Sequence, residues 1–185
     1  MTFKQASTPP AQGYACALEV ELRVETNRLI HTTRLTNTGE KPFTTDHYLH
    51  NFLRFGEAET GPGYRLSFPF DIALCDRTNG PPEEPNPPFV QVAPRTLSFA
   101  DPASGTPIAG KTFVRDPAEG EASRSFTVEH AGNGQRLTVT ASRPFFNVGI
   151  WITPFQLSPE ANVVMTVAPG ETETLVRTYE FEVSD

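Results

Sequence analysis

The chain has 185 residues, which is enough for one domain with a sizeable core. Its formal net charge of -7 and its pI of about 5.1 argue against nucleic acid or an anionic membrane surface as the main partner. No stretch approaches the ~20 apolar residues that cross a membrane, and the N-terminus lacks the apolar segment of a secretory signal, so we expect a cytoplasmic protein.

Alternation of apolar and polar residues with a period of two is the strongest pattern along the chain. It predicts, in chain order, a hairpin over 15–36, a strand over 64–70 with one apolar face, a hairpin over 123–142 and a closing hairpin over 162–183. "NTGEKP" (37–42) predicts a turn, and the nearly continuous apolar run "FFNVGIWIT" predicts a strand over 145–153 that is buried on both faces. No segment has a convincing amphipathic-helix pattern, and 18 prolines and 13 glycines interrupt the chain too often for long helices.

The Pro-rich segment 76–107 interrupts this series of strands. Strand-like sequence resumes on both sides of it, so we expect a long ordered excursion around a sheet rather than a linker between domains. Many short strands joined by turns are typical of an all-β fold. The sequence therefore predicts a single domain over 1–185, built as an antiparallel β-sandwich whose core is rich in phenylalanine rings.

Two histidines stand three residues apart in "TTDHYLHNFLRF" (44–55), at His47 and His50. On an extended strand, side chains at an odd separation point to opposite faces, which argues against a shared metal ion unless a bulge intervenes. The third ligand of such a site would be His31, Asp46 or His130. An imidazole with a pKa near ~6.5 is instead a natural acid or base near neutrality, and the rings around it suit a sugar or another flat-faced ligand.

A carboxylate follows in "LSPEANVV", where Glu160 comes directly after Pro159 at the beginning of a strand. The pattern alone fits a solvated loop carboxylate equally well. A carboxylate and a histidine on opposing strands would form a general base and acid pair. Trp151, the one tryptophan, lies on the preceding strand and is expected either near the ligand pocket or in the core.

Motifs for other chemistries are absent from the sequence. There is no P-loop, no dinucleotide fingerprint and no nucleophile elbow, so we expect no cofactor. Cys16 and Cys75 match no zinc-binding spacing and are expected to be reduced, partly buried thiols.

The segment "LTNTGEKPFTTDHYLHNF" resembles the "N-T-G … T … Y-x-H-N-F" segment of aldose 1-epimerase-like proteins, which belong to the galactose mutarotase-like superfamily. "GPGYRLSFPF" and the closing "SPEANVVMTVAPGETETLVRTYEFEV" are similar to the family's later motifs. The similarities are in the right order and cover both ends of the chain, whereas 76–122 matches little. The resemblance implies the C-terminal share of a β-supersandwich, in a shortened relative that lacks the family's N-terminal part and the histidine, in a His-Gly setting, found there.

The resemblance also implies a reaction and roles for particular residues. Family enzymes interconvert sugar anomers: a glutamate takes the proton of the C1 hydroxyl and a histidine protonates the ring oxygen. The motifs place His50 as that acid and Glu160 as that base, and we expect His47, Asn51 and Trp151 to bind the substrate.

Three functions are compatible with the sequence: an anomer-interconverting isomerase, a non-catalytic carbohydrate-binding sandwich, and a metal-dependent small-molecule enzyme that uses both histidines. The expected ligand is a small sugar or sugar derivative. A shortened sandwich would expose a sheet edge and part of its apolar face, so we expect either that the Pro-rich segment 76–107 folds over this face or that the chain forms a homodimer, and we favour the homodimer.

Overall fold

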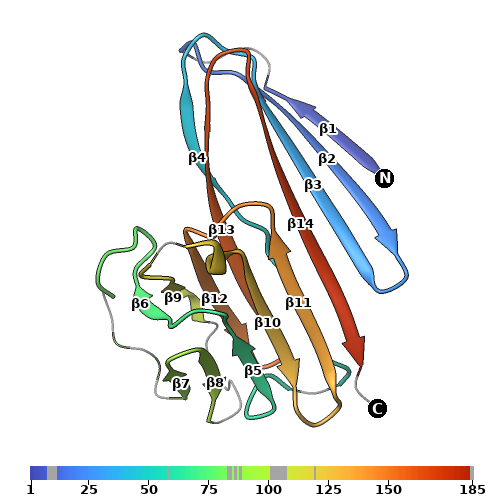
Figure 1. Ribbon diagram of the computed structural model, residues 1–185, viewed down its shortest axis with the longest axis vertical. Helices are drawn as coiled ribbons and strands as arrows, with labels where there is room; N and C mark the ends of the chain where they lie inside the picture. The colour runs from blue at the N-terminus through green and yellow to red at the C-terminus, as the bar shows by residue number, and fades with distance from the viewer. Residues whose placement is uncertain are drawn as a thin grey trace.

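The computed structural model describes residues 1–7, 12–57, 59–82, 85, 87, 89–100, 108–118 and 120–183, which form two antiparallel sheets (Figure 1). The nine-stranded sheet has the order β1 (Thr2–Ala6), β2 (Cys16–Glu25), β3 (Arg28–Asn37), β14 (Thr172–Val183), β11 (Gln135–Ala141), β10 (Ser125–His130), β5 (Tyr64–Ser67), β8 (Thr96–Phe99) and β7 (Val90–Ala93). The five-stranded sheet has the order β4 (Phe43–His47), β13 (Gln156–Val167), β12 (Asn147–Thr153), β9 (Ile108–Arg115) and β6 (Ala73–Cys75).

The described residues contain no α-helix, and one 3-10 helix spans Glu121–Arg124. None of their helices is long and apolar enough to cross a membrane. The predicted all-β sandwich is therefore confirmed.

Most predicted strands are present. The hairpin over 15–36 is β2 and β3, and the hairpin over 123–142 is β10 and β11. The strand over 145–153 is β12, whose residues are mostly buried, and the alternate residues of 64–70 all face the core. The core lies between the sheets, where the Phe126 ring of β10 contacts the rings of Phe68 and Phe145.

The closing hairpin predicted over 162–183 is wrong. β13 pairs with β12 and β4 in the five-stranded sheet, whereas β14 pairs with β3 and β11 in the other. A short turn between two alternating strands has the same sequence pattern whether the chain folds back beside itself or crosses to the facing sheet. The hairpin that forms instead joins β12 to β13 through Pro154 and Phe155.

The buried Asn37 holds two crossings between the sheets together. Its side-chain amide donates to the carbonyl oxygens of Lys41 (2.9 Å) and Val167 (2.9 Å), which lie after β3 and at the end of β13. Its backbone carbonyl accepts from Gly170 (2.9 Å), which adopts a positive φ of 80° in the turn before β14. One asparagine thus fixes where the chain leaves the nine-stranded sheet after β3 and where it returns to that sheet before β14.

The Pro-rich segment 76–107 contains a hairpin that the sequence did not predict. β7 and β8 pair with each other, and β8 pairs with β5 at the edge of the nine-stranded sheet. Part of the segment, including 101–107, lies outside the described residues. Cys16 and Cys75 are both free, and burial raises the pKa of the Cys75 thiol to about 11.

Candidate functional site

The histidine-rich segment runs beside β13 in an unbroken antiparallel register. His47 at the end of β4 pairs with Val163, and Leu53 forms a bridge with Leu157 through two backbone hydrogen bonds of 2.8 and 3.0 Å. The same register places His50 opposite Glu160.

Pro159 interrupts the regular ladder between these two bridges, because proline has no backbone N–H to donate. The side-chain amide of Asn51 donates to the Pro159 carbonyl oxygen instead, at 2.8 Å. The oxygen of the same amide accepts from the Tyr179 hydroxyl at 3.1 Å. Asn51 therefore fixes the segment between β13 and the facing strand β14 while its neighbours turn outward.

His50 and Glu160 meet on the outer face of the five-stranded sheet. Nδ1 of His50 lies 2.6 Å from Oε1 of Glu160, and the hydroxyl of the fully buried Ser158 lies 3.1 Å from the same oxygen. The His50 side chain is 58% exposed and that of Glu160 is 15% exposed. Among the described residues, Nε2 of His50 and Oε2 of Glu160 have no hydrogen-bond partner, so these two atoms are available to a ligand.

A cleft of about 450 Å³ surrounds this pair, which falls within the roughly 300–1,000 Å³ of small-molecule sites. It is lined by Tyr48, His50, Phe52, Arg77, Phe113, Trp151, Glu160 and Asn162. Gly149 pairs with both Glu160 and Phe113 on the neighbouring strands. A Cβ atom at Gly149 would lie 2.8 Å from the Phe113 ring, so glycine lets that ring cover the strand beside Glu160.

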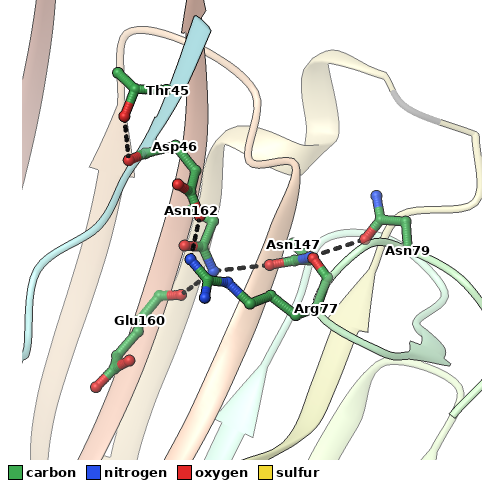
Figure 2. Close-up of polar contacts among 7 residues, drawn as sticks. All are labelled: Thr45, Asp46, Arg77, Asn79, Asn147, Glu160 and Asn162. Atoms are coloured by element: carbon green, nitrogen blue, oxygen red, sulfur yellow. Dashed lines mark hydrogen bonds and ion pairs between the residues drawn. The ribbon is translucent and has the colours of Figure 1, made fainter. Parts of the chain in front are cut away.

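Arg77 enters the cleft from the turn after β6, and Figure 2 shows the polar contacts that hold it. Its guanidinium donates to Asp46 at 2.9 Å. The amides of Asn162 and Asn147 form a chain across β13 and β12: Asn162 donates to Asn147 (2.8 Å), which donates to Asn79 (2.9 Å) and to the Arg77 carbonyl oxygen (3.0 Å). The turn that carries Arg77 is therefore fastened to the outer face of the sheet.

The chain was compared with known proteins. No family model matches the sequence, and no curated protein matches it. Solved structures match: a putative aldose 1-epimerase from Escherichia coli K12 has 12% sequence identity and a TM-score of 0.69, covering 99% of this chain and 66% of that chain. A galactose mutarotase related enzyme from Lactobacillus acidophilus has 10% identity and a TM-score of 0.68, with 98% and 67% covered. A galactose mutarotase-like protein from Clostridium acetobutylicum has 14% identity and a TM-score of 0.68, with 99% and 62% covered.

The chain has the galactose mutarotase-like fold. It spans about two thirds of the length of these structures. The resemblance predicted from the motifs is thus confirmed at the level of the fold, and identities of 10–14% establish the fold alone.

Within this galactose mutarotase-like fold, the structure brings together three of the five predicted site residues. His50, Glu160 and Trp151 line the cleft. Asn51 does not line it, because both ends of its amide are engaged with Pro159 and Tyr179. His47 lies on the opposite side of the strand, where it lines a separate apolar groove with Leu18, Leu35 and Phe43.

His47 contacts Arg177, a fully buried side chain of β14. Arg177 donates to the His47 carbonyl oxygen (2.8 Å) and to the Ala161 carbonyl oxygen (3.1 Å), and its Nη1 lies 2.9 Å from Nδ1 of His47. Burial, followed by the charge of Arg177, lowers the pKa of His47 to about 4. Burial and the same charge lower the pKa of His31 as well.

The two histidines therefore diverge as the strand geometry predicted. Among the described residues, no group of three or more His, Cys, Asp or Glu side chains is placed to hold a metal ion. Sequence reasoning missed Arg77, Asn147 and Asn162. The signal for Asn147 was present, because a single amide within the apolar strand "FFNVGIWIT" has to find a hydrogen-bond partner when buried.

Proposed function

We propose that the protein interconverts the anomers of an aldose or a closely related sugar in the His50–Glu160 cleft. The observation that carries the proposal is the 2.6 Å contact between Nδ1 of His50 and Oε1 of Glu160 on the cleft floor. The galactose mutarotase-like fold and the size of the cleft support it. The names of the similar structures suggest a sugar as the substrate, and the side chains of His50 and Glu160 suggest acid–base chemistry.

In ring opening, Glu160 gains one proton and His50 loses one; in ring closure both transfers are reversed. Oε2 of the ionised Glu160 takes the proton of the C1 hydroxyl, while Nε2 of the protonated His50 gives a proton to the ring oxygen. The bond between C1 and the ring oxygen breaks, which leaves an open-chain aldehyde. Rotation about the C1–C2 bond and reversal of both proton transfers give the other anomer. The contact between Nδ1 and Oε1 keeps the acid and base oriented throughout.

Ser158 orients the base. Its hydroxyl lies 3.1 Å from Oε1 of Glu160, the oxygen that also contacts His50. With Oε1 engaged twice, the unpartnered Oε2 is the better placed proton acceptor. Ser158 is itself fully buried, so it restricts the rotation of the carboxylate rather than contacting the sugar.

A non-catalytic carbohydrate-binding role is the second candidate. The openness of the cleft favours it, because more than half of the His50 side chain is exposed to solvent. An acid so close to water gains less from exclusion of solvent than one in a closed site.

Exchange of anomers, measured by NMR on purified protein with a panel of aldoses, tests the proposal. Catalysis above the spontaneous rate that is lost in Glu160→Gln and kept in Glu171→Gln, an exposed control, is the expected result. Saturable binding without catalysis would identify the second candidate instead. Neither catalysis nor binding with any aldose would refute both.

A further inference from the structure

A continuous row of aromatic rings crosses the candidate site. The Tyr48 ring meets the His50 ring edge-on at 5.2 Å between centroids, and His50 stacks on Phe52 at 5.7 Å and 9°. Phe52 meets Trp151 at 5.3 Å and 77°. All four side chains line the same cleft, and three of them come from alternate positions of one extended segment.

Much of this row is open to solvent. The exposed fraction is 37% for Tyr48 and 54% for Phe52, and these two rings belong to one row, whereas no ring contact joins the other exposed rings, Phe3, Tyr14, Phe146, Phe155 and Phe181, among the described residues. Exposed rings gathered in one place mark a binding surface more often than rings scattered singly. Neither the acid–base chemistry nor the packing of the sandwich requires Phe52 to lie at the surface.

The row extends beyond what one sugar ring can contact. The three successive centroid distances are 5.2, 5.7 and 5.3 Å, so a single pyranose placed on His50 and Glu160 does not cover all four rings, and Trp151 is the ring furthest along the row from Tyr48. The corner formed by Phe52 and Trp151 presents two rings at a steep angle, which is an apolar shelf for the C–H face of a second sugar ring. Arg77, whose side chain is 64% exposed, is available to hydroxyl groups of the ligand, whereas the buried Asn162 donates its amide to Asn147 and to the Glu160 carbonyl oxygen.

We infer that the natural ligand is a reducing oligosaccharide of two or more pyranose rings. Its reducing-end ring lies between His50 and Glu160, and the next ring lies on the shelf formed by Phe52 and Trp151. This inference rests on the proposed sugar site and names the substrate class that the site selects. Because the shelf is open, the rest of the saccharide chain leaves the cleft without steric hindrance.

Calorimetric titration with three series of sugars tests the inference: glucose, maltose and maltotriose; galactose and lactose; xylose and xylobiose. In at least one series we expect the disaccharide to bind about tenfold or more tightly than its monosaccharide, a difference of about 1.4 kcal/mol. Phe52→Ala should remove that gain, so that the ratio of disaccharide affinity to monosaccharide affinity falls to about one. Phe52→Leu, which keeps apolar bulk without the ring, should lose most of the gain while preserving the packing of the segment.

Phe155→Ala is the matched control, because Phe155 is also 54% exposed but lies in the turn between β12 and β13, outside the row. Phe155→Ala should leave the affinities for the monosaccharide and for the disaccharide unchanged. Equal affinity for short and long sugars in every series, or a gain that survives Phe52→Ala, would overturn the inference. So would an equal loss in Phe155→Ala.

Anomer exchange measured on the same samples separates this inference from the proposed function. Catalysis without any dependence of affinity on the length of the sugar would support the isomerase and refute the oligosaccharide ligand. Length-dependent binding without catalysis would do the opposite. Failure of every sugar to bind would refute both the isomerase activity and the oligosaccharide ligand.

Discussion

The two oxygens of the Glu160 carboxylate have different surroundings, and the difference assigns their roles. Oε1 contacts His50 and Ser158, whereas Oε2 has no partner among the described residues. Glu160→Gln should therefore depress turnover by roughly 10²–10⁴-fold, the usual contribution of a general base, with little change in sugar affinity. Turnover and affinity are measured by anomer-exchange NMR and calorimetry, and equal turnover in variant and parent would exclude the assigned role.

His50 should behave as the second half of the same unit. In His50→Asn the amide can still contact Oε1, but it has no titratable proton for the ring oxygen. We expect a fall in turnover of similar size and a pH–rate profile that loses one of its two limbs. A profile with both limbs intact in the variant would show that another group is the acid.

His47 makes stability depend on pH, first through its burial and second through the charge of the buried Arg177. Its folded-state pKa of about 4 lies below the unfolded value near 6.5, so the unfolded chain binds the proton more readily. Stability is complete above pH 6.5 and falls as the pH drops from 6.5 to 4, by on the order of 1–3 kcal/mol because the side chain is partly exposed. Urea unfolding at several pH values should show this slope, and His47→Gln, which keeps an acceptor for Arg177, should flatten it. An identical slope in parent and variant would contradict the explanation.

At the scale of elements, β13 connects the core to the site. One face packs Leu157, Ala161 and Val163 into the core, and the other carries Glu160 into the cleft with the buried Ser158 hydroxyl against its carboxylate. Because strand side chains alternate, burial of the first set orients the second. The position of Glu160 is thus enforced by the packing on the reverse side of the same strand.

The turn that carries Arg77 should depend on the chain of asparagine amides beneath it. Asn147 is buried and supplies two of the hydrogen bonds that fasten this turn. Asn147→Ala leaves the Asn79 oxygen and the Arg77 carbonyl without these donors, so we expect a loss of about 1–3 kcal/mol in the free energy of unfolding. Asn27→Ala, an exposed control with one hydrogen bond, should cost about 0.5 kcal/mol or less. Chemical denaturation measures both, and equal losses would show that burial of the amide is unimportant.

How much of this was predictable differs from element to element. Alternation identifies β2, β3, β10 and β11, whose two faces differ in polarity, and a nearly continuous apolar run identifies β12, which is mostly buried. It does not reveal which sheet a strand joins, so β13 and β14 were assigned to one hairpin although they belong to facing sheets. Partner choice depends on contacts remote in sequence, such as those of Asn37, that no local pattern contains.

In the candidate site, too, the sequence does not reveal which segments are neighbours. Motifs selected His50 and Glu160, but the register that sets them opposite each other comes from the pairing of β4 with β13. The same motif suggested substrate binding by Asn51, whose amide the structure places on Pro159 and Tyr179. The Pro159 carbonyl oxygen can be recognised as the acceptor for Asn51 only once the two segments are known to be neighbours.

At the scale of the whole molecule, the nine-stranded sheet extends beyond the five-stranded one. β1 forms a free edge among the described residues. Two apolar side chains on β1 and β2 are exposed near this edge, with Phe3 at 53% and Val24 at 79%. The β7–β8 hairpin of the Pro-rich segment lies at the opposite edge of this sheet, so it does not cover the apolar face near β1 (Figure 1). A free edge beside an apolar face favours association with another strand.

We expect this edge to pair with the same edge of a second copy in a two-fold homodimer. The backbone N–H and C=O of Phe3 point toward β2, so those of Thr2 and Lys4 point away from β2, toward the free edge. An antiparallel pairing that sets Thr2 opposite Lys4 of the partner brings the two Phe3 side chains together and keeps the two lysines from facing each other. Sedimentation at micromolar concentration should show a dimer, and Phe3→Lys should shift it to monomer without changing thermal stability. Val92→Lys, at an exposed position on the far edge strand β7, is the control and should leave the dimer intact. A monomeric parent would show that the edge at β1 stays unpaired in solution.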